Sequence, residues 1–394
     1  MTSDPYNAFL HLEAQRGTGG PVVGVKDVID VAGMPTTAAS QILHRLPEQD
    51  ADCVARLRAA GATIAGKLNT HEFAFGALTN SPHFGPALNP WNTAHSCGGS
   101  SGGSGAAVAA GLVDVSLGTD TAGSVRIPSA FCGVTGVRPS AGLVSNDGVF
   151  PTAPTLDTVG PLARSASECR QILETLAGRS LDSSASDLRI GVVTSLFEGA
   201  NPGVAAACEA AIRELPGRLE TVTIPLHEEI ATITQLIMLP EATAVHLPWL
   251  RTRLADYGPD VRARLLAGLV LPPTAHATGM RAQRWVRDEW ERALGGYDVL
   301  VAPAMPITAP RLDAIPADYR LLVMPYNSPA ALLGLPVVVA PAGFVDGLPV
   351  GLALTGRRGE DGVPLALAEA FQKRTDWHLR SPVDSGPLKR LYTT

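Results

Sequence analysis

The stretch GGSSGGSGAAVAAGLVDVSLGTDTAGS, residues 98–124, alternates between glycine-rich turns and two segments of regular structure. Within it, AAVAAGL (106–112) is typical of a small-residue helix, and VDVSLG (113–118) is typical of a buried strand. Small residues then turn the chain just before Ser124. Such a turn can direct consecutive backbone N–H groups into one cavity, where they would stabilise a developing negative charge.

Strands and helices alternate along the rest of the chain. Apolar runs predict strands at 22–25, 63–67, 188–193, 299–303 and 336–341. Helical spacing predicts helices at 51–61, 166–178, 203–214, 240–295 and 364–374, and the proline breaks of 80–97 predict a loop. Residues 1–20 are expected to form a short polar lead-in with about one helical turn. The alternation predicts an α/β fold with a mostly buried sheet.

The composition narrows the class of protein. The chain has 394 residues, of which 45% are hydrophobic and 17% charged, as in a globular protein that buries a large core. Its net charge is −6 and no basic stripe is visible, so we expect no nucleic-acid partner. No apolar run approaches the roughly 18 residues of a membrane helix, and the N-terminus lacks a signal pattern. We therefore predict a soluble, cytoplasmic protein without a membrane partner.

Cysteine and histidine usage argues against a metal or disulfide framework. The five cysteines are Cys53, Cys97, Cys132, Cys169 and Cys208. Their number is odd, no CxxC pair occurs, and the nine histidines show no HxxxH or HExxH spacing. The sequence therefore predicts a reducing compartment, with no metal and no cofactor.

The glycine-rich segment GGSSGGSG (98–105) has several interpretations. A phosphate-binding loop would need a lysine after the glycines, and none follows. The pattern GxSxG matches at Ser100 and again at Ser101, which suggests a nucleophile elbow. However, the loop NPWNTAHSC (89–97) stands where that elbow needs a strand, so we disfavour this interpretation.

Lys26 follows the predicted strand VVGV (22–25) in a chain where only four of the 31 basic residues are lysines. A lysine can act as a base once burial lowers its pKa, which an arginine cannot do. The alternative is a lysine that reaches solvent and pairs with Asp27. Without the rest of the sequence, this pairing with Asp27 would be the preferred interpretation of Lys26.

Several segments together resemble the amidase signature family. They are GVKDVIDVAGMPTTAAS (24–40), AGKLNTHEFAFG (65–76), SPHFGPALNPW (81–91), GGSSGGSG (98–105), GTDTAGSVRIPSAFCG (118–133), NSPAALLGLPVVVAPAGF (327–344) and GLPVGLALTG (347–356). The resemblance covers roughly residues 21–372 and preserves the order of its motifs. It implies one α/β/α domain over 21–380 with a mixed central sheet surrounded by helices, between the lead-in (1–20) and a tail (381–394).

The resemblance also implies an activity and a set of residues. The activity is hydrolysis of the C–N bond of a small carboxamide to an acid and ammonia or an amine. Ser124 matches the nucleophile, Ser100 the serine that follows a cis peptide bond, and Lys26 the general base. The backbone matching the oxyanion hole is that of Thr121, Ala122 and Gly123, with Ser101, Asp120 and Arg126 as supporting residues.

Those roles form a consistent reaction. A buried, neutral Lys26 would take a proton from Ser100, which would take one from Ser124. Ser124 would then attack the amide carbonyl and form an acyl-enzyme, which water hydrolyses. Ester cleavage would be a plausible side activity, since it passes through the same acyl-enzyme.

Other interpretations of single residues remain open. Ser124 is alternatively an ordinary turn serine, and Ser101 could take the role given to Ser100. Asp120 and Arg126 are expected to be structural rather than catalytic. Packed or rim positions are expected for Cys97, Cys132, His71, His83 and His95.

The chain departs from the family pattern at two places. Only 25 residues precede Lys26, fewer than usual, which leaves the oligomeric state open, with a homodimer as one option. Ala122 stands where many members have glycine, and its methyl group would narrow the oxyanion hole. The short N-terminus favours a stand-alone hydrolase. The alternatives are an amidotransferase A-type subunit working with a partner, or an inactive member acting as a binding protein.

The substrate-binding pocket is the least specified part. Residues 240–330 and the loop 144–157 are expected to shape it, since they carry least of the motifs. Trp249, Tyr257 and Tyr326 are candidates for its lining, and each is an equally good core residue. The identity of the amide does not follow from the sequence.

Overall fold

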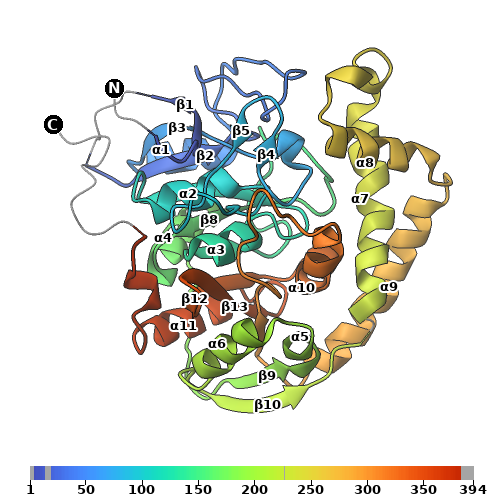
Figure 1. Ribbon diagram of the computed structural model, residues 1–394. Helices are drawn as coiled ribbons and strands as arrows, with labels where there is room; N and C mark the ends of the chain where they lie inside the picture. The colour runs from blue at the N-terminus through green and yellow to red at the C-terminus, as the bar shows by residue number, and fades with distance from the viewer. Residues whose placement is uncertain (1–3, 14–18, 226, 383–394) are drawn as a thin grey trace.

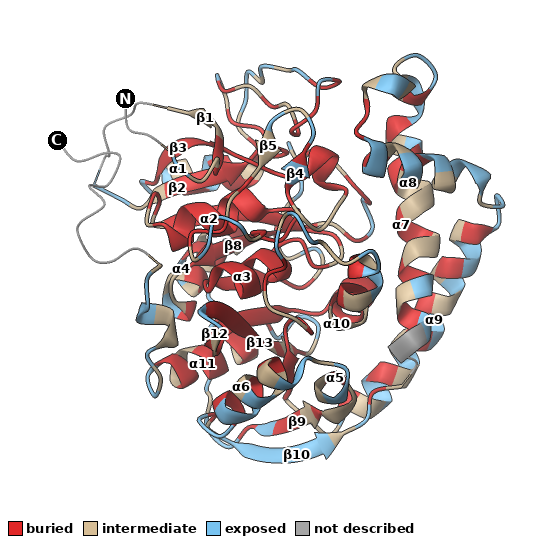
Figure 2. Cartoon of the chain, viewed as in Figure 1, coloured by how far each residue is buried: buried red, intermediate tan, exposed pale blue. Residues whose placement is uncertain are grey.

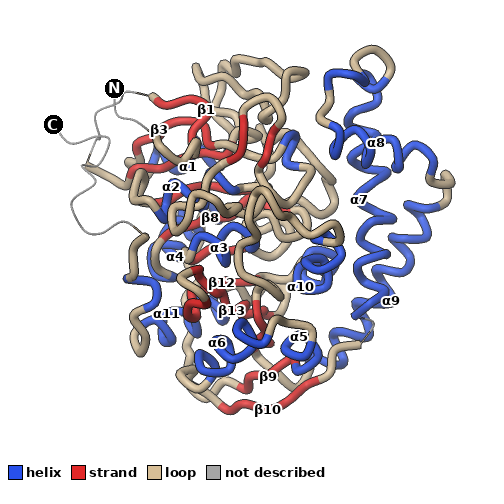
Figure 3. Tube along the Cα trace, viewed as in Figure 1, coloured by secondary structure: helices blue, strands red, loops and turns tan. Residues whose placement is uncertain are grey.

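The computed structural model describes residues 4–13, 19–225 and 227–382. Parts of the predicted lead-in (1–3 and 14–18) and most of the predicted tail (383–394) lie outside the described residues. The described chain is a mixed α/β fold in which helices flank a large central sheet, as the sequence predicted (Figures 1 and 3).

Eleven strands of the described chain form one sheet in the order β1-β3-β2-β6-β8-β7-β12-β13-β11-β9-β10. They are β1 (Phe9–Leu12), β2 (Val22–Lys26), β3 (Thr63–Leu68), β6 (Val115–Asp120), β7 (Thr135–Arg138), β8 (Thr158–Ala163), β9 (Arg189–Val193), β10 (Arg218–Val222), β11 (Val299–Pro303), β12 (Val337–Val345) and β13 (Leu348–Gly356). The sheet is mixed: β2 runs parallel to β3 and β6, whereas β8 is antiparallel to β6 and β7. A separate pair, β4 (Asn80–Ser81) and β5 (Gly85–Pro86), lies in the predicted loop.

Helices lie on both faces of the sheet. The α-helices are α1 (Asp52–Ala59), α2 (Gly102–Ala109), α3 (Arg126–Cys132), α4 (Ala166–Ala177), α5 (Thr194–Glu198), α6 (Pro202–Ile212), α7 (His227–Leu250), α8 (Pro259–Val270), α9 (Ala275–Leu294), α10 (Tyr319–Leu333) and α11 (Gly362–Gln372). Short 3-10 helices span Glu72–Ala74, Leu254–Asp256 and Trp377–Leu379. Helix α4 contacts both α1 and α11, whereas α2 contacts α3.

Two successive residues of β8 show that apolar side chains cover both faces of the central sheet. Leu162 packs in an apolar cluster with α2, and Ala163 packs in a second, larger cluster with α1 and α4. Side chains of a strand alternate between the two faces of its sheet. Both faces are therefore apolar and covered, and Figure 2 shows the resulting buried centre.

Local sequence explains how the flanking helices begin and end. At the start of α4, Ser165 and Glu168 form a capping box, in which each side chain binds the backbone N–H of the other residue. The helix ends at Gly178, whose φ of 67° is a conformation that glycine adopts without strain. The predicted helix at 166–178 is therefore confirmed within one residue of its bounds.

Helices α7, α8 and α9 pack together as a helical layer along one side of the fold, seen at the right of Figure 1. The window Glu229–Leu250 of α7 is long and apolar enough to cross a membrane, contrary to our expectation for apolar runs. However, 44% of the 18-residue stretch that meets this criterion is buried inside the fold, and α7 contacts α8, α9 and α10. Core helices of soluble proteins pass the same composition test.

Two other expectations need correction. Phe9–Leu12 form β1 rather than a helical turn, because this segment pairs antiparallel with the edge of β3. The predicted helical region 240–295 begins earlier, at His227, and is interrupted before α8 and again before α9. Helix α10 was not predicted, because Pro325 and Pro329 lie inside it.

Candidate active site

Lys26 is the last residue of β2, and its side chain is fully buried. Its Nζ donates hydrogen bonds of 2.7 Å to Ser100 Oγ and of 2.7 Å to Thr119 Oγ1. A longer contact of 3.3 Å joins Nζ to the carbonyl oxygen of Thr119. Strands β2 and β6 are parallel neighbours, so their carboxyl ends lie at one edge of the sheet and bring Lys26 beside Thr119.

The alternative in which Lys26 pairs with Asp27 is wrong. Asp27 instead lies 3.1 Å from Nζ of Lys67, and both side chains are buried. Asp27 also accepts hydrogen bonds from the hydroxyl and the backbone N–H of Thr37. Lys26 is therefore surrounded by hydroxyl groups rather than paired with its sequence neighbour.

Ser100 lies in a closely packed turn and follows a cis peptide bond from Gly99. Its carbonyl oxygen accepts hydrogen bonds of 2.9 Å from the hydroxyls of Thr70 and Thr79. A side chain at Gly99 would place its Cβ 2.5 Å from the backbone nitrogen of Leu78. Only glycine fits there, and the turn that orients Ser100 depends on that close approach.

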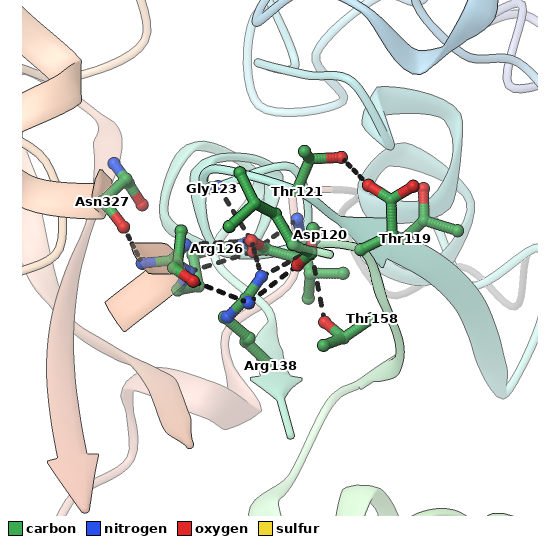
Figure 4. A network of polar contacts seen from close by, with 12 residues as sticks. Thr119, Asp120, Thr121, Gly123, Arg126, Arg138, Thr158 and Asn327 are labelled. Atoms are coloured by element: carbon green, nitrogen blue, oxygen red, sulfur yellow. Dashed lines mark hydrogen bonds and ion pairs between the residues drawn. The ribbon is translucent and has the colours of Figure 1, made fainter. Parts of the chain in front are cut away.

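Asp120 organises the turn that carries Ser124, as Figure 4 shows. Its carboxylate accepts hydrogen bonds from the backbone N–H groups of Gly123 (2.8 Å) and Val125 (3.1 Å). The guanidinium groups of Arg126 and Arg138 also bind it, at 2.9 and 2.8 Å. Burial alone would raise the pKa of this carboxyl, but the two arginines and the hydrogen bonds hold it well below its usual range.

Gly123 has a φ of 119°, and a Cβ there would lie 2.7 Å from the side chain of Asn327. The turn therefore requires glycine at this position. Because the Gly123 N–H donates to Asp120, the free donors near Ser124 must come from elsewhere in the turn. The oxyanion-hole roles of Thr121, Ala122 and Gly123 stay a prediction.

Ser124 is 7% exposed and lines a pocket together with Thr121 and Ala122. Its carbonyl oxygen accepts a 3.1 Å hydrogen bond from the N–H of Ser101, which connects the Ser124 turn to the Ser100 turn. The Ser101 hydroxyl in turn donates to the carbonyl of Thr119. The structure thus brings all the predicted catalytic and supporting residues into one region.

Burial brings the pKa of Lys26 close to neutral pH, although the carboxylates around it favour the charged amine. Burial lowers its pKa from 10.5 to about 7, although Asp120 and Asp157 act in the opposite direction. Burial also raises the pKa of Asp157 to about 6, against a 2.6 Å hydrogen bond from the Thr121 hydroxyl. A lysine with this pKa can accept a proton at neutral pH.

The pocket over Ser124 is walled by segments distant in sequence. They are the loop Ala74–Ala77, Thr152, Ile127 of α3, Gln235 and Met238 of α7, Arg264 of α8, and Arg320, Val323 and Met324 of α10. The two regions that were predicted to shape the pocket, 240–330 and 144–157, both contribute residues to its lining. The loop Ala74–Ala77 and the α7 residues were not predicted, because no motif or periodicity indicates where they pack.

The aromatic candidates lie outside this pocket lining. Trp249 stacks on Phe73 at 5.8 Å, and the Tyr257 hydroxyl lies 2.9 Å from His246 Nδ1. The Tyr326 hydroxyl donates to the carbonyl of Leu196. Trp249 and Tyr257 therefore act as packing residues here, whereas Tyr326 lines a separate cavity together with Asn327 and Leu196.

The cysteines and histidines beside the site are also structural. Cys97 and Cys132 are buried free thiols, and burial raises the pKa of Cys97 well above its usual value. The three upstream histidines each contact one group: His71 lies 3.4 Å from Asp260, His83 lies 3.3 Å from Glu72, and His95 lies 2.7 Å from the Ala309 carbonyl. Within the described ranges, no group of three or more His, Cys, Asp or Glu side chains could hold a metal ion.

Three residues of the site were missed. Thr119 binds Lys26, Arg138 binds Asp120, and Asp157 binds Thr121. Thr119 lies inside the motif GTDTAGSVRIPSAFCG, near the end of a predicted strand. Had this strand been assumed to pair in parallel with β2, the ends of the two strands would have placed Thr119 beside Lys26. Arg138 and Asp157 carry no local signal, because antiparallel pairing of later strands brings them to the site.

Residues 18–363 match the family described as Amidase, and the chain belongs to this family. The A subunit of glutamyl-tRNA(Gln) amidotransferase from Roseiflexus castenholzii is 37% identical, with 94% of this chain and 86% of the relative covered.

Two solved structures are similar in fold. One is an amidase with a TM-score of 0.88 and 34% identity, which covers 94% of this chain and 92% of that one. The other is the A subunit of glutamyl-tRNA(Gln) amidotransferase from Thermotoga maritima, with a TM-score of 0.83 and 32% identity, covering 94% and 88%. These likenesses bear out both the predicted fold and the predicted family.

Proposed function

We propose that this amidase-family hydrolase cleaves the C–N bond of a carboxamide through an acyl-enzyme on Ser124. The observation that carries the proposal is the 2.7 Å contact between the fully buried Lys26 and Ser100, beside a pocket that Ser124 lines. No other lysine side chain in the described part of the chain contacts a serine hydroxyl.

The proposed proton path runs through the two serines. Neutral Lys26 takes the hydroxyl proton of Ser100 as Ser100 takes that of Ser124, and Ser124 Oγ attacks the carbonyl carbon. Backbone N–H groups of the Thr121–Ser124 turn, other than the Gly123 N–H that binds Asp120, stabilise the negative charge on the carbonyl oxygen. The proton returns through Ser100 to the leaving nitrogen, ammonia or amine departs, and water hydrolyses the ester.

A second candidate function is that of an amidotransferase component, which uses the same chemistry with a partner protein. The 37% identity to the A subunit of a glutamyl-tRNA(Gln) amidotransferase, over most of both chains, favours it over a stand-alone hydrolase of small amides. Under this proposal, ammonia from the amide passes to an acceptor supplied by the partner. An inactive family member that only binds is the third candidate.

Ammonia release from a panel of primary amides, glutamine included, separates these candidates. Release by wild type but not by Ser124→Ala supports a stand-alone amidase, and Ser184→Ala, at an exposed position, is the matched control serine. If release requires a co-purified partner, the amidotransferase candidate is favoured. If a fluorophosphonate probe also fails to label Ser124, the protein is an inactive member.

The remaining properties are part of the same proposal. We propose a cytoplasmic protein, and its five free, buried cysteines suit a reducing compartment. A homodimer and the absence of a nucleic-acid partner stay predictions. Size-exclusion chromatography with light scattering decides between monomer and dimer.

A further inference from the structure

Strand β10 (Arg218–Val222) is an open edge of the large sheet. It comes last in the strand order, and within the described chain it pairs with β9 alone. Four of its five residues are exposed, Leu219 to 42%, and Figure 2 shows the strand in pale blue at the lower margin of the molecule. The opposite edge, β1, has no exposed residue. An edge as open as β10 is a template for pairing with another strand.

The backbone groups available at this edge belong to Leu219 and Thr221. The N–H of Arg218 donates to the carbonyl oxygen of Leu188, on the side of β9. Alternate residues of an edge strand bond to its parallel neighbour, so Arg218 and Glu220 direct their N–H and C=O groups toward β9. Leu219 and Thr221 direct theirs away from the sheet, where no described strand lies.

The charges along β10 are complementary to those of a second, antiparallel copy of the same strand. When Leu219 lies opposite Leu219 of the second copy, each Arg218 lies opposite a Glu220 on one face of the ladder. The outward backbone groups of the two Leu219 residues then form a hydrogen-bonded pair. The Arg218 and Glu220 positions become the close pairs, with about 4.5 Å between Cα atoms. Opposite charges at directly opposed positions stabilise a ladder.

Other registers of self-pairing lose this match. A two-fold axis at Glu220 places the two Glu220 carboxylates opposite each other, and an axis at Arg218 does the same to the two guanidinium groups, which is destabilising. An axis at Thr221 places Glu220 opposite the apolar Val222. Charged residues on an edge strand normally hinder pairing, whereas in β10 they favour a single register.

The existing ion pairs leave both charges available. Glu220 lies 3.5 Å from Arg189 of β9, and both side chains are about half exposed, so this contact is worth little in free energy. Among the residues that the structure describes, no carboxylate lies within ion-pair distance of Arg218. A second copy would supply that carboxylate through its own Glu220.

We propose that this edge binds a second copy of the chain, in a two-fold symmetric dimer whose β10 strands pair antiparallel about Leu219. The two sheets then become one continuous sheet. The inference is independent of the proposed function, since no residue of β10 lines the pocket over Ser124. A five-residue strand buries less surface than a typical stable interface, so we expect a dimer that dissociates on dilution.

The first test is sedimentation-velocity centrifugation of the full chain over a series of concentrations. The weight-average molar mass should rise from that of one chain toward that of two. A chain that stays monomeric up to its solubility limit overturns the inference, whichever other molecule covers the edge.

Charge reversal tests the register. Arg218→Glu and Glu220→Arg each place like charges at both close positions of the two-fold pair, so each should raise the dissociation constant by roughly tenfold. The double variant restores opposite charges and should recover wild-type association. Arg281→Glu, an exposed arginine of α9, is the matched control and should dimerise normally. If the single reversals leave association unchanged, or the double variant fails to recover it, the inference is wrong.

Leu219→Pro tests the backbone pairing. Proline removes the outward N–H of Leu219 but keeps the groups of Arg218 and Glu220 that bond to β9, so dimerisation should be lost. Leu219→Ala keeps that N–H and should still dimerise, with a dissociation constant within roughly tenfold of wild type. Circular dichroism shows whether each variant is folded. A folded Leu219→Pro that dimerises like wild type overturns the inference, and if this variant does not fold, the charge reversals decide.

Discussion

Asp27 Oδ1 lies 3.1 Å from Lys67 Nζ, in an ion pair where both side chains are almost fully buried. Asp27 directly follows Lys26 in the sequence, but its carboxylate pairs with Lys67 and not with Lys26. Lys26 is left among neutral hydroxyl groups, where burial lowers its pKa to about 7. Four predictions depend on this environment of Lys26, and a fifth concerns the turn that holds Ser124.

Lys26→Met should lower amide turnover by at least about a hundredfold, because it removes the proposed base while keeping similar volume. Ammonia release is the measurement. Lys373→Met, at an exposed position, is the control and should retain activity. Near-normal turnover by Lys26→Met would contradict the proposed mechanism.

The pH dependence of kcat/KM should follow the ionisation of Lys26. Only the neutral amine accepts a proton, so the rate should rise with pH through a midpoint near 7 and then level off. Initial rates between pH 5 and 9 provide the test. A rate that stays constant, or that falls through this range, argues against a lysine base.

Lys26→Met should also make the protein more stable than wild type, and the difference should depend on pH. The pKa of Lys26 is about 7 in the folded state and about 10.5 when unfolded, so the folded state binds fewer protons between these values. Stability of wild type therefore rises with pH in that window, by about 1.4 kcal/mol per unit at most. Urea unfolding at pH 7 and pH 9 should show a larger advantage of the variant at pH 7.

Thr119→Val should lower kcat and shift the pH midpoint downward. The Thr119 hydroxyl accepts a hydrogen bond from Lys26, which favours the charged amine, so its removal lowers the lysine pKa further. Thr234→Val is a suitable control, since that buried threonine binds only within α7. An unchanged midpoint in Thr119→Val would mean that Thr119 does not position the base.

Asp120→Asn should destabilise the fold by about 3–5 kcal/mol, because Arg126 and Arg138 would remain buried without a charge partner. Since the folded pKa of Asp120 is lowered, its contribution is complete above the ordinary value of 3.8 and decreases progressively as the pH falls from 3.8 toward the lower folded pKa. Chemical denaturation at neutral pH measures the effect. Asp361→Asn is the comparison, because that buried carboxylate binds Ser140 and should cost less to change. Equal losses in the two variants would mean that the arginines add nothing specific.

The sequence predicted the central motif well because its structure is local. The strand was confirmed as Val115–Asp120, two residues later than predicted, whereas the small-residue helix spans Gly102–Ala109 rather than 106–112. Strand β2 was also confirmed, at Val22–Lys26. Apolar runs of this length specify burial by themselves. The glycines were a weaker guide, because Gly102, Gly103 and Gly105, expected in a turn, lie inside α2.

What the sequence could not predict depends on contacts between distant segments. The pairing of Asp27 with Lys67 joins residues 40 positions apart, and no periodicity specifies such a partner. Side chains alternate along a strand, so Lys26 and Asp27 point to opposite sides of the sheet. This alternation was an argument, available from the sequence, against the expected ion pair between Lys26 and Asp27. The pocket walls were unpredictable for the same reason, because helix patterns do not say where a helix packs.

The sheet edge that holds Lys26, Ser100 and Ser124 is built from residues 22–124, whereas α7, α8 and α10, which wall the pocket, lie between 227 and 333. The proposed catalytic groups and the helical part of the pocket wall are therefore encoded in separate stretches of the chain, although the loop Ala74–Ala77 and Thr152 also line the pocket. Substitutions in the later stretch can change which compounds enter without disturbing the earlier one. For protein engineering, this makes the helical stretch the natural place for a combinatorial library, with the glycine-rich stretch left untouched.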